Sequence, residues 1–257
     1  MDFQYLKIKP DSEPQSFERI LLKYDTLQSM ISDYNKRDLY FIDNNIQFDV
    51  SSLVIKKECI ICKLDNFKTI IFTNQAYVSY SDAFFNKKTE WIMFSQTQQK
   101  ENKIFHLNIL EFLLMNVLDN LEDEYNIIFT SYGQLRHSTN NNKDFKDFVA
   151  LQSNLLKLEY RVKELHTITE ELVKNKDDLQ ELTFEKCEVD LVDNLIDNYD
   201  LKLEDIYNDI SRLVREIENI QRDANIKLAR ERNKLARMTL KVSVVSLTVQ
   251  SLFVNIS

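Results

Sequence analysis

A heptad repeat in the last quarter of the sequence constrains the fold more than any other feature. Between residues 189 and 224, apolar side chains recur at alternating three- and four-residue steps over five heptads, at Val189, Val192, Ile196, Tyr199, Leu203, Ile206, Ile210, Leu213, Ile217, Ile220 and Ala224. This spacing puts them on one seam of a long helix, and neighbouring helices have to cover such a seam. After a four-residue stutter the seam continues beyond residue 228. We therefore predict a long stalk helix that packs against neighbouring helices.

The end of the sequence has a different composition. From Met238 to Ser257 the single charged residue is Lys241, and the uncharged part, 242–257, has 16 residues. About 20 apolar residues are needed to span a bilayer. Basic residues precede this stretch, as at a membrane–water boundary, namely Lys227, Arg230, Arg232, Lys234 and Arg237. We predict the start of a transmembrane helix; the alternative is an amphipathic helix buried against its own domain.

The N-terminal part alternates between strand and helix patterns. Residues 2–9 predict a strand, and residues 14–33 carry apolar residues at helical spacing. Short β-branched and aromatic runs within 51–80 are separated by charged or Asn-containing turns, which is typical of a small sheet. Residues 91–95 predict one more strand.

Helical patterns follow the strands. Apolar stripes at 105–117 and 144–182 predict amphipathic helices, with a polar loop at 138–144. Strands first and helices later favour an α+β fold with a small mixed or antiparallel sheet flanked by helices. The long coiled-coil-like stalk helix would then run into a transmembrane helix. We expect three regions: a soluble α/β regulatory domain (1–182), the stalk (183–237) and the start of the first transmembrane helix (238–257).

Composition narrows the function. The net charge of −8 argues against nucleic-acid binding and permits affinity for cations. A single glycine, Gly133, and two prolines leave few residues for phosphate-binding loops, which argues against P-loop and Rossmann enzymes. The histidines lie in separate segments without a catalytic partner spacing, so we expect no enzyme.

Two cysteines raise the question of a metal site. Cys59 and Cys62 form a C-I-I-C run inside an apolar stretch, and no second pair of cysteines follows. We therefore favour buried strand cysteines over zinc ligands.

Several segments resemble one family of membrane proteins. The run LARERNKLARMTLKVSVVSLTVQSLFVNIS (228–257) is similar to the junction of stalk and first transmembrane helix in CorA-type magnesium channels of the mitochondrial branch, where an Arg-Asn pair precedes a Leu-rich span. The pair here is Arg232 and Asn233. KRDLYFIDNN (36–45), the strand runs after it, and ELVKNKDDLQELTF also resemble the family pattern, so the likeness covers nearly the whole chain.

The sequence also departs from that family. The Gly-Met-Asn signature would fall just beyond Ser257, and the second transmembrane helix is absent, so we expect a truncated chain or a paralogue that lost the pore. An acidic residue before the Arg-Asn pair and a methionine after it are common in the family, but Ala229 and Ala236 occupy these positions.

The resemblance implies a homopentamer in a lipid bilayer that transports Mg²⁺ and is gated by Mg²⁺ bound to its soluble domain. Arg232 and Asn233 would lie at the pore entrance. The mitochondrial inner membrane is the expected location, with vacuolar and plasma membranes as alternatives. The alternative function is a pore-dead or truncated paralogue that acts as a membrane-anchored coiled-coil interaction protein.

Carboxylates at the start of the stalk suggest where regulatory Mg²⁺ would bind. Five of them are candidate ligands between subunits: Asp190, Asp193, Asp197, Asp200 and Glu204. Occupied sites would hold a closed state, and empty sites would release like-charge repulsion. A solvated acidic helix face is the alternative interpretation.

Overall fold

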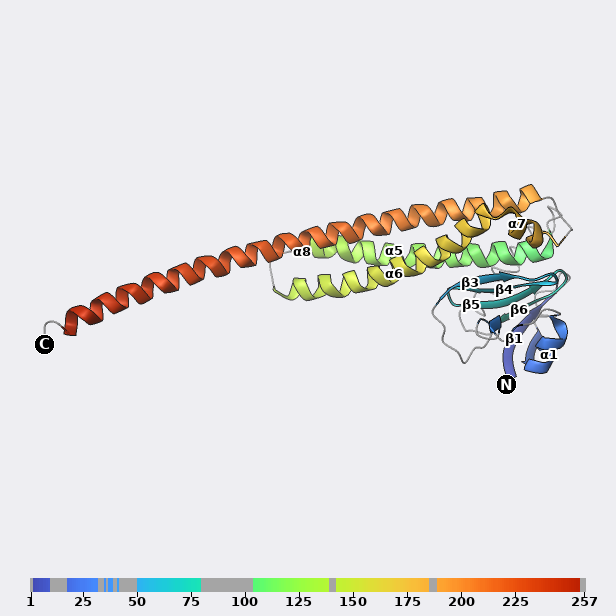
Figure 1. Cartoon of the computed structure of the whole chain (residues 1–257), viewed down its shortest axis with the longest axis horizontal. Coiled ribbons are helices and arrows are strands. Elements are labelled where there is room, and N and C mark those ends of the chain that lie inside the picture. The colour runs from blue at the N-terminus through green and yellow to red at the C-terminus, as the bar shows by residue number, and fades with distance from the viewer. Residues whose placement is uncertain are drawn as a thin grey trace.

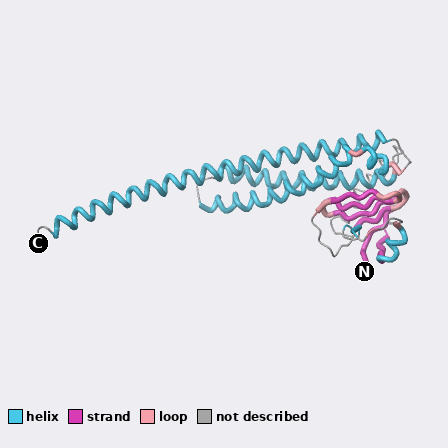
Figure 2. The backbone as a smooth tube through the Cα atoms, viewed as in Figure 1, coloured by secondary structure: helices cyan, strands magenta, loops and turns pink. Residues whose placement is uncertain are grey.

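The structure combines a small sheet with a long helical bundle. The computed structural model describes residues 2–9, 18–31, 35, 37–38, 41, 50–79, 104–138, 142–184 and 189–254. The sheet lies beside one end of the bundle, and the last helix extends well past the bundle's other end (Figures 1 and 2). The α+β class with a long C-terminal helix is thereby confirmed.

Six strands form one sheet in the described part of the chain. They are β1 (Asp2–Ile8), β2 (Glu18–Lys23), β3 (Ser52–Ile55), β4 (Cys59–Leu64), β5 (Phe67–Phe72) and β6 (Ala76–Ser79). Their order across the sheet is β2-β1-β6-β5-β4-β3, and the neighbouring pairs are antiparallel. The sheet is therefore antiparallel rather than mixed.

Both faces of the sheet are buried. Ile60, Cys62 and Leu64 belong to the core shared with the helical bundle, whereas Cys59 and Ile61 belong to the core on the opposite face. Alternate residues of a strand point to opposite faces, so the two cysteines cannot share a metal ion. Burial is the main cause that raises the pKa of each thiol to about 12. The preference for buried strand cysteines is confirmed.

The helix predicted over residues 14–33 is partly wrong. Residues 18–23 form β2, and α1 (Tyr24–Met30) begins only afterwards. β2 pairs antiparallel with β1, with Tyr5 opposite Ile20. Pairing with the edge of β1 satisfies the backbone N–H and C=O groups of β2. The spacing of apolar residues within 14–33 cannot reveal that such a partner strand is present. Residues 14–17 and the strand predicted at 91–95 lie outside the described residues.

Four helices make up the rest of the described chain from residue 104 onwards. They are α5 (Phe105–Ser138), α6 (Asn142–Lys174), α7 (Lys176–Leu182) and α8 (Val189–Val254). The segment predicted as one helix over 144–182 is divided at Asn175, whose side chain caps α7 by accepting a hydrogen bond from the Asp177 backbone N–H at 3.2 Å. The Asn side chain competes with the backbone for hydrogen bonds inside a helix and is favoured at N-caps, which explains why the helix is interrupted at Asn175.

The first half of the heptad seam is covered within the chain. Side chains from Val192 to Ile217 on α8 are buried in the same core as the apolar faces of α5 and α6. The neighbouring helices that this part of the seam requires are therefore α5 and α6 of the same chain, and packing against copies of the chain stays a prediction. α8 continues without a break across residue 237, so the predicted region boundary there stays a prediction.

Polar contacts fix how α6 and α8 lie against each other. Three side-chain hydrogen bonds link the two helices, between Thr169 and Asp200 (2.5 Å), Glu159 and Ser211 (2.6 Å), and Gln152 and Gln221 (2.9 Å). Along this series the residue numbers fall on α6 as they rise on α8. The helices are therefore antiparallel, and a shift along either axis would break all three hydrogen bonds, each worth about 0.5–1.5 kcal/mol.

One arginine connects the sheet to the bundle. Arg161 on α6 donates from Nε and Nη2 to the carboxylate of Asp65 at 2.9 and 3.1 Å, and from Nη1 to Glu124 on α5 at 2.6 Å. Asp65 lies in the turn between β4 and β5 with φ of 51°, a left-handed conformation that Asp tolerates better than most residues. This bidentate pair fixes the sheet's position on the bundle.

Replacing Ile210 by alanine tests the internal seam. Ile210 is fully buried on α8 (0% exposed), so Ile210→Ala should lower the free energy of unfolding by about 2–5 kcal/mol. Leu191 on the same helix is 59% exposed, so Leu191→Ala should change it by no more than about 0.5 kcal/mol. Urea unfolding followed by circular dichroism measures both. Equal effects would contradict the assignment of the seam.

Candidate functional site

The candidate site is α8 itself, which carries every residue predicted to contact an ion. Its first half packs in the bundle, and its second half extends beyond the end of the α5–α6 hairpin (Figure 1). The predicted regulatory carboxylates lie on the first half and the predicted pore-entrance residues on the second. The two groups are therefore linked by one uninterrupted helix.

Four of the five predicted regulatory carboxylates face solvent. Asp190, Asp193, Asp197 and Glu204 are exposed on α8. Successive spacings of three, four and seven residues place them along one side of the helix. Within the described residues, no group of three or more His, Cys, Asp or Glu side chains is arranged to hold a metal ion. A single chain thus presents these carboxylates as a row that another chain could approach.

Asp200 is engaged inside the chain. Its Oδ1 accepts a hydrogen bond from Thr169 Oγ1 at 2.5 Å and lies 3.5 Å from His166 Nε2, both on α6. The His166 ring also stacks on Tyr207 of α8, with ring centroids 6.4 Å apart. This network cannot be predicted from the sequence, because Asp193 and Asp200 both follow a buried seam residue and, of the two, Asp200 is the one with α6 beside it.

His106 holds the end of α7 against α5. Its ring is buried, with Nε2 3.0 Å from the Leu182 carbonyl oxygen, and it packs edge-on against Phe184 at 4.8 Å between centroids. The structure thus gives His106 and His166 packing and bridging positions in the bundle.

The predicted pore-entrance residues lie on the extended half of α8. Arg232 and Asn233 are exposed, within the run of basic residues that begins at Lys227. Apolar side chains on one side of the helix around and after them are exposed too, with Leu235 at 63% and Val242 at 68%. Exposed apolar side chains in such a row mark a surface that contacts protein or lipid.

Among the helices of the described residues, none is both long enough and apolar enough to cross a bilayer.

The sequence matches one family over most of its length. The family described as "Magnesium transporter MRS2-like" matches residues 21–232. The match takes in the strands from β3 to β6, the helical bundle and α8 up to Arg232.

Three yeast proteins are similar to the chain. The mitochondrial inner membrane magnesium transporter MRS2 of Candida glabrata is 25% identical over 227 residues, which is 82% of this chain and 50% of that protein. The mitochondrial magnesium transporter MRS2 of Saccharomyces cerevisiae is 24% identical over 225 residues, 82% of this chain and 48% of that protein. The mitochondrial inner membrane magnesium transporter MRS2 of Yarrowia lipolytica is 26% identical over 148 residues, 55% of this chain and 35% of that protein.

The matches cover only part of each relative. The chain spans about half the length of the first two relatives. All three relatives are named as transporters, and none as an enzyme.

The different environments of Asp200 and Asp197 give a matched test. Asp200→Ala removes the carboxylate that accepts from Thr169 Oγ1, and the hydroxyl keeps the His166 carbonyl oxygen at 3.0 Å as an acceptor, so the free energy of unfolding should fall by about 0.5–1.5 kcal/mol relative to Asp197→Ala. Both substitutions remove one negative charge from α8, so helix propensity and net charge change equally. Thermal and urea unfolding measure the difference. Indistinguishable variants would show that the Thr169 contact does not stabilise the fold.

Proposed function

Because the chain belongs to the MRS2-like magnesium transporter family, as the match over residues 21–232 shows, we propose that it is a subunit of a protein that moves Mg²⁺ across a membrane. The observation that carries the proposal, beyond the family itself, is the form of α8. A single helix runs from the packed bundle, through a basic segment, into a row of exposed apolar residues.

The extended half of α8 supports an assembly of several chains. Leu235, Met238, Val242 and Val245 lie along one side of the helix and are each more than half exposed, and fully burying one such side chain is worth about 1.5–3 kcal/mol. Copies of the chain packed around a common axis, with lipid outside them, would bury this row. We propose a homopentamer, the number of subunits that the resemblance to CorA-type channels implies, with residues 238–257 as the start of the first transmembrane helix.

The basic run would mark the water side of that membrane. Lys and Arg gather beside transmembrane segments, where their charges stay hydrated while the apolar residues enter lipid. Lys227, Arg230, Arg232, Lys234 and Arg237 precede the apolar stretch on α8. Two of the three relatives are named for the mitochondrial inner membrane and the third as mitochondrial, so we propose that membrane as the location.

Arg232 and Asn233 would line the entrance to the pathway. Mg²⁺ keeps its waters tightly, so an amide oxygen can contact the hydrated ion without replacing its shell. A ring of Asn233 side chains would offer such oxygens, and a ring of Arg232 charges would limit how fast cations enter.

The exposed carboxylates on α8 would form regulatory Mg²⁺ sites between chains. Asp190, Asp193, Asp197 and Glu204 face solvent and repel one another when no cation is present. A bound Mg²⁺ would remove this repulsion and stabilise the arrangement that binds it best. We leave Asp200 out of the proposed ligand set because Thr169 and His166 already occupy its carboxylate.

Magnesium should stabilise the chain through these carboxylates. At a Mg²⁺ concentration about ten times the dissociation constant, linkage predicts a gain of about 1.4 kcal/mol in unfolding free energy, or a rise of about 3–6 °C in the thermal midpoint. A variant with Asp190, Asp193 and Asp197 changed to Asn and Glu204 to Gln should lose this rise.

A control separates binding from screening. Neutralising the exposed Glu122, Asp123, Glu218 and Asp223 removes the same charge from other positions and should leave the magnesium effect in place. NaCl at matched ionic strength should not reproduce the effect. If both quadruple variants respond to Mg²⁺ like the parent, then Asp190, Asp193, Asp197 and Glu204 are not the binding site.

Transport is tested with the full gene product in liposomes that contain a Mg²⁺-sensitive dye. We expect Mg²⁺ entry down its gradient, and Asn233→Ala should slow it by about tenfold because the amide ring is lost. Asn225→Ala, the same exposed residue type two turns earlier on α8, should leave the rate within about twofold. A parent protein that inserts without any Mg²⁺ flux would favour the interaction-protein alternative.

A further inference from the structure

Five basic residues on the extended half of α8 lie along one side of the helix. They follow one another at steps of three, four, three and four residues and form the basic stripe: Lys227, Arg230, Lys234, Arg237 and Lys241. At about 100° per residue, this spacing confines them to an arc of about 80°. All five are exposed. Most of the basic run in the sequence therefore forms one charged side of the helix.

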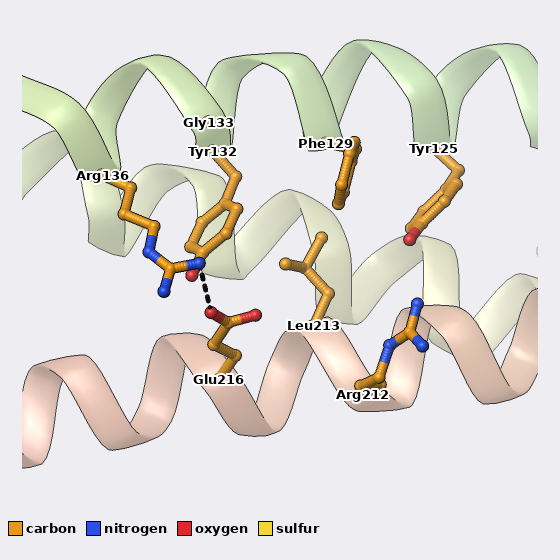
Figure 3. A pocket seen from close by; sticks show the side chains of 8 residues that line it. All are labelled: Tyr125, Phe129, Tyr132, Gly133, Arg136, Arg212, Leu213 and Glu216. Carbon is orange, nitrogen blue, oxygen red and sulfur yellow. Dashed lines mark ion pairs between the residues drawn. The ribbon is translucent and has the colours of Figure 1, made fainter.

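Arginines at the contact between α5 and α8 have carboxylate partners. Arg136 Nη1 lies 2.8 Å from Glu216 Oε1, and Figure 3 shows this ion pair joining the two helices. Arg212 Nη2 lies 3.0 Å from Asp209 Oδ1 on α8 itself. In the bundle these positive charges are thus balanced inside the chain.

The basic stripe has no such balance. None of its five side chains forms an ion pair or a hydrogen bond with a residue that the structure describes. Residues 222–241 include seven Lys or Arg and two Asp or Glu, although the whole chain has a net charge of −8. Neighbouring members of the stripe are three or four residues apart, where like charges destabilise a helix. An anionic surface beside the stripe would relieve this repulsion.

The basic stripe and Arg232 lie on different sides of α8. At about 100° per residue, each member of the stripe is about 140–180° around the helix from Arg232. If Arg232 lines the entrance to the pathway, the stripe faces away from the pathway. The anions that the stripe meets are then those that surround the assembly.

The side of α8 that carries the stripe becomes uncharged directly after Lys241. The sequence has no charged residue from 242 to 257, and Val244, three residues after Lys241, is 51% exposed. At 1.5 Å per residue the stripe is about 21 Å long. A bilayer offers these two environments in the same order, because its polar headgroup layer covers a hydrocarbon core.

We propose that the basic stripe binds the phosphate groups of anionic phospholipids on the water side of the membrane. This inference rests on the proposed membrane location of α8 and adds the partner and the side of the helix that contacts it. Each Lys or Arg near an anionic membrane surface strengthens binding by about fivefold. Arg237 and Lys241, next to the apolar stretch, contribute most. Lys227 contributes least, because it lies about 21 Å from Lys241 and salt screens charges beyond about 8–10 Å.

Carboxylates of a second copy are the alternative anions. Asp190, Asp193, Asp197 and Glu204 are exposed on α8 too. Glu204, the last of them, precedes Lys227 by 23 residues, or about 35 Å along the helix. In an assembly of parallel copies around one axis, each stripe lies level with the stripes of its neighbours and not with these carboxylates. Lipid phosphates are the anions that reach the level of the stripe.

Sedimentation of the full chain with vesicles tests the proposal. One preparation contains phosphatidylcholine alone, and in the other about one lipid in three is phosphatidylglycerol, whose phosphate gives the lipid a net negative charge. The partition coefficient of the parent chain should be at least about 25-fold higher for the anionic vesicles, which corresponds to two basic residues at the surface. NaCl at about 1 M should lower this preference to about threefold or less.

Two variants with five substitutions each show whether the stripe is the contact. Changing the five stripe residues to Gln should leave a preference of about twofold or less for anionic vesicles. The control changes three other exposed lysines and two other exposed arginines to Gln, so that its net charge is the same, namely Lys157, Lys163, Lys176, Arg215 and Arg222. It should keep the parent's preference within about twofold. Circular dichroism checks that both variants are folded.

Two double variants test which end of the stripe lies at the membrane. Arg237→Gln with Lys241→Gln should lower the preference for anionic vesicles by about tenfold or more. Lys227→Gln with Arg230→Gln removes the same two residue types and should lower it by about twofold or less.

Three results would each overturn the proposal. They are equal partition of the parent into neutral and anionic vesicles, the same loss of preference in the stripe variant and its control, and a larger loss in the Lys227 and Arg230 double variant than in the other. Equal binding to both kinds of vesicle rejects the phosphate contact and leaves the membrane location standing. Failure of the parent to bind either kind rejects both.

Discussion

The burial of the α8 seam is the interaction on which the rest of the structure depends. Over Val192 to Ile217, α8 shares one apolar core with α5, α6 and the sheet. This contact turns a helix that would be unstable alone into the rigid axis of the molecule, since most helix stability in proteins comes from packing of the apolar face. Where the α5–α6 hairpin ends, the covering ends too, and α8 continues with its apolar residues exposed.

The length of α8 gives this arrangement its mechanical consequence. The helix has 66 residues, and at 1.5 Å per residue the part beyond residue 220 alone reaches about 50 Å. Carboxylates at the bundle end and the Arg232-Asn233 pair on the extended end share this one rod. A displacement of α8 caused by cation binding at the carboxylates would therefore also displace Arg232 and Asn233. The contacts of α8 with α6 and the Arg161–Asp65 pair would hold the rest of the bundle together during this movement.

The sequence predicted the large elements because their signals are local. Heptad spacing gave the long helix, and alternating apolar residues around Cys59 and Cys62 gave a buried strand. The helix predicted at 14–33 was partly wrong because residues 18–23 pair as β2 with the edge of β1, which lies outside that segment. Local spacing contains no information about such an edge.

The candidate site was less predictable for the same reason. Asp193 and Asp200 occupy equivalent heptad positions, and only the placement of α6 decides that Asp200 is bound to Thr169 while Asp193 faces solvent. The Asp65–Arg161–Glu124 contact joins three segments far apart in the sequence.

Hydrogen–deuterium exchange along α8 tests the central claim most directly, namely that the chain covers only the first half of this helix and that the second half needs lipid or other chains. Without lipid, amides of residues 192–217 should exchange slowly and those beyond residue 228 rapidly. Adding lipid bilayers should slow exchange selectively in residues 238–254. Slow exchange of the whole helix in lipid-free protein, or no effect of lipid on its second half, would contradict the account.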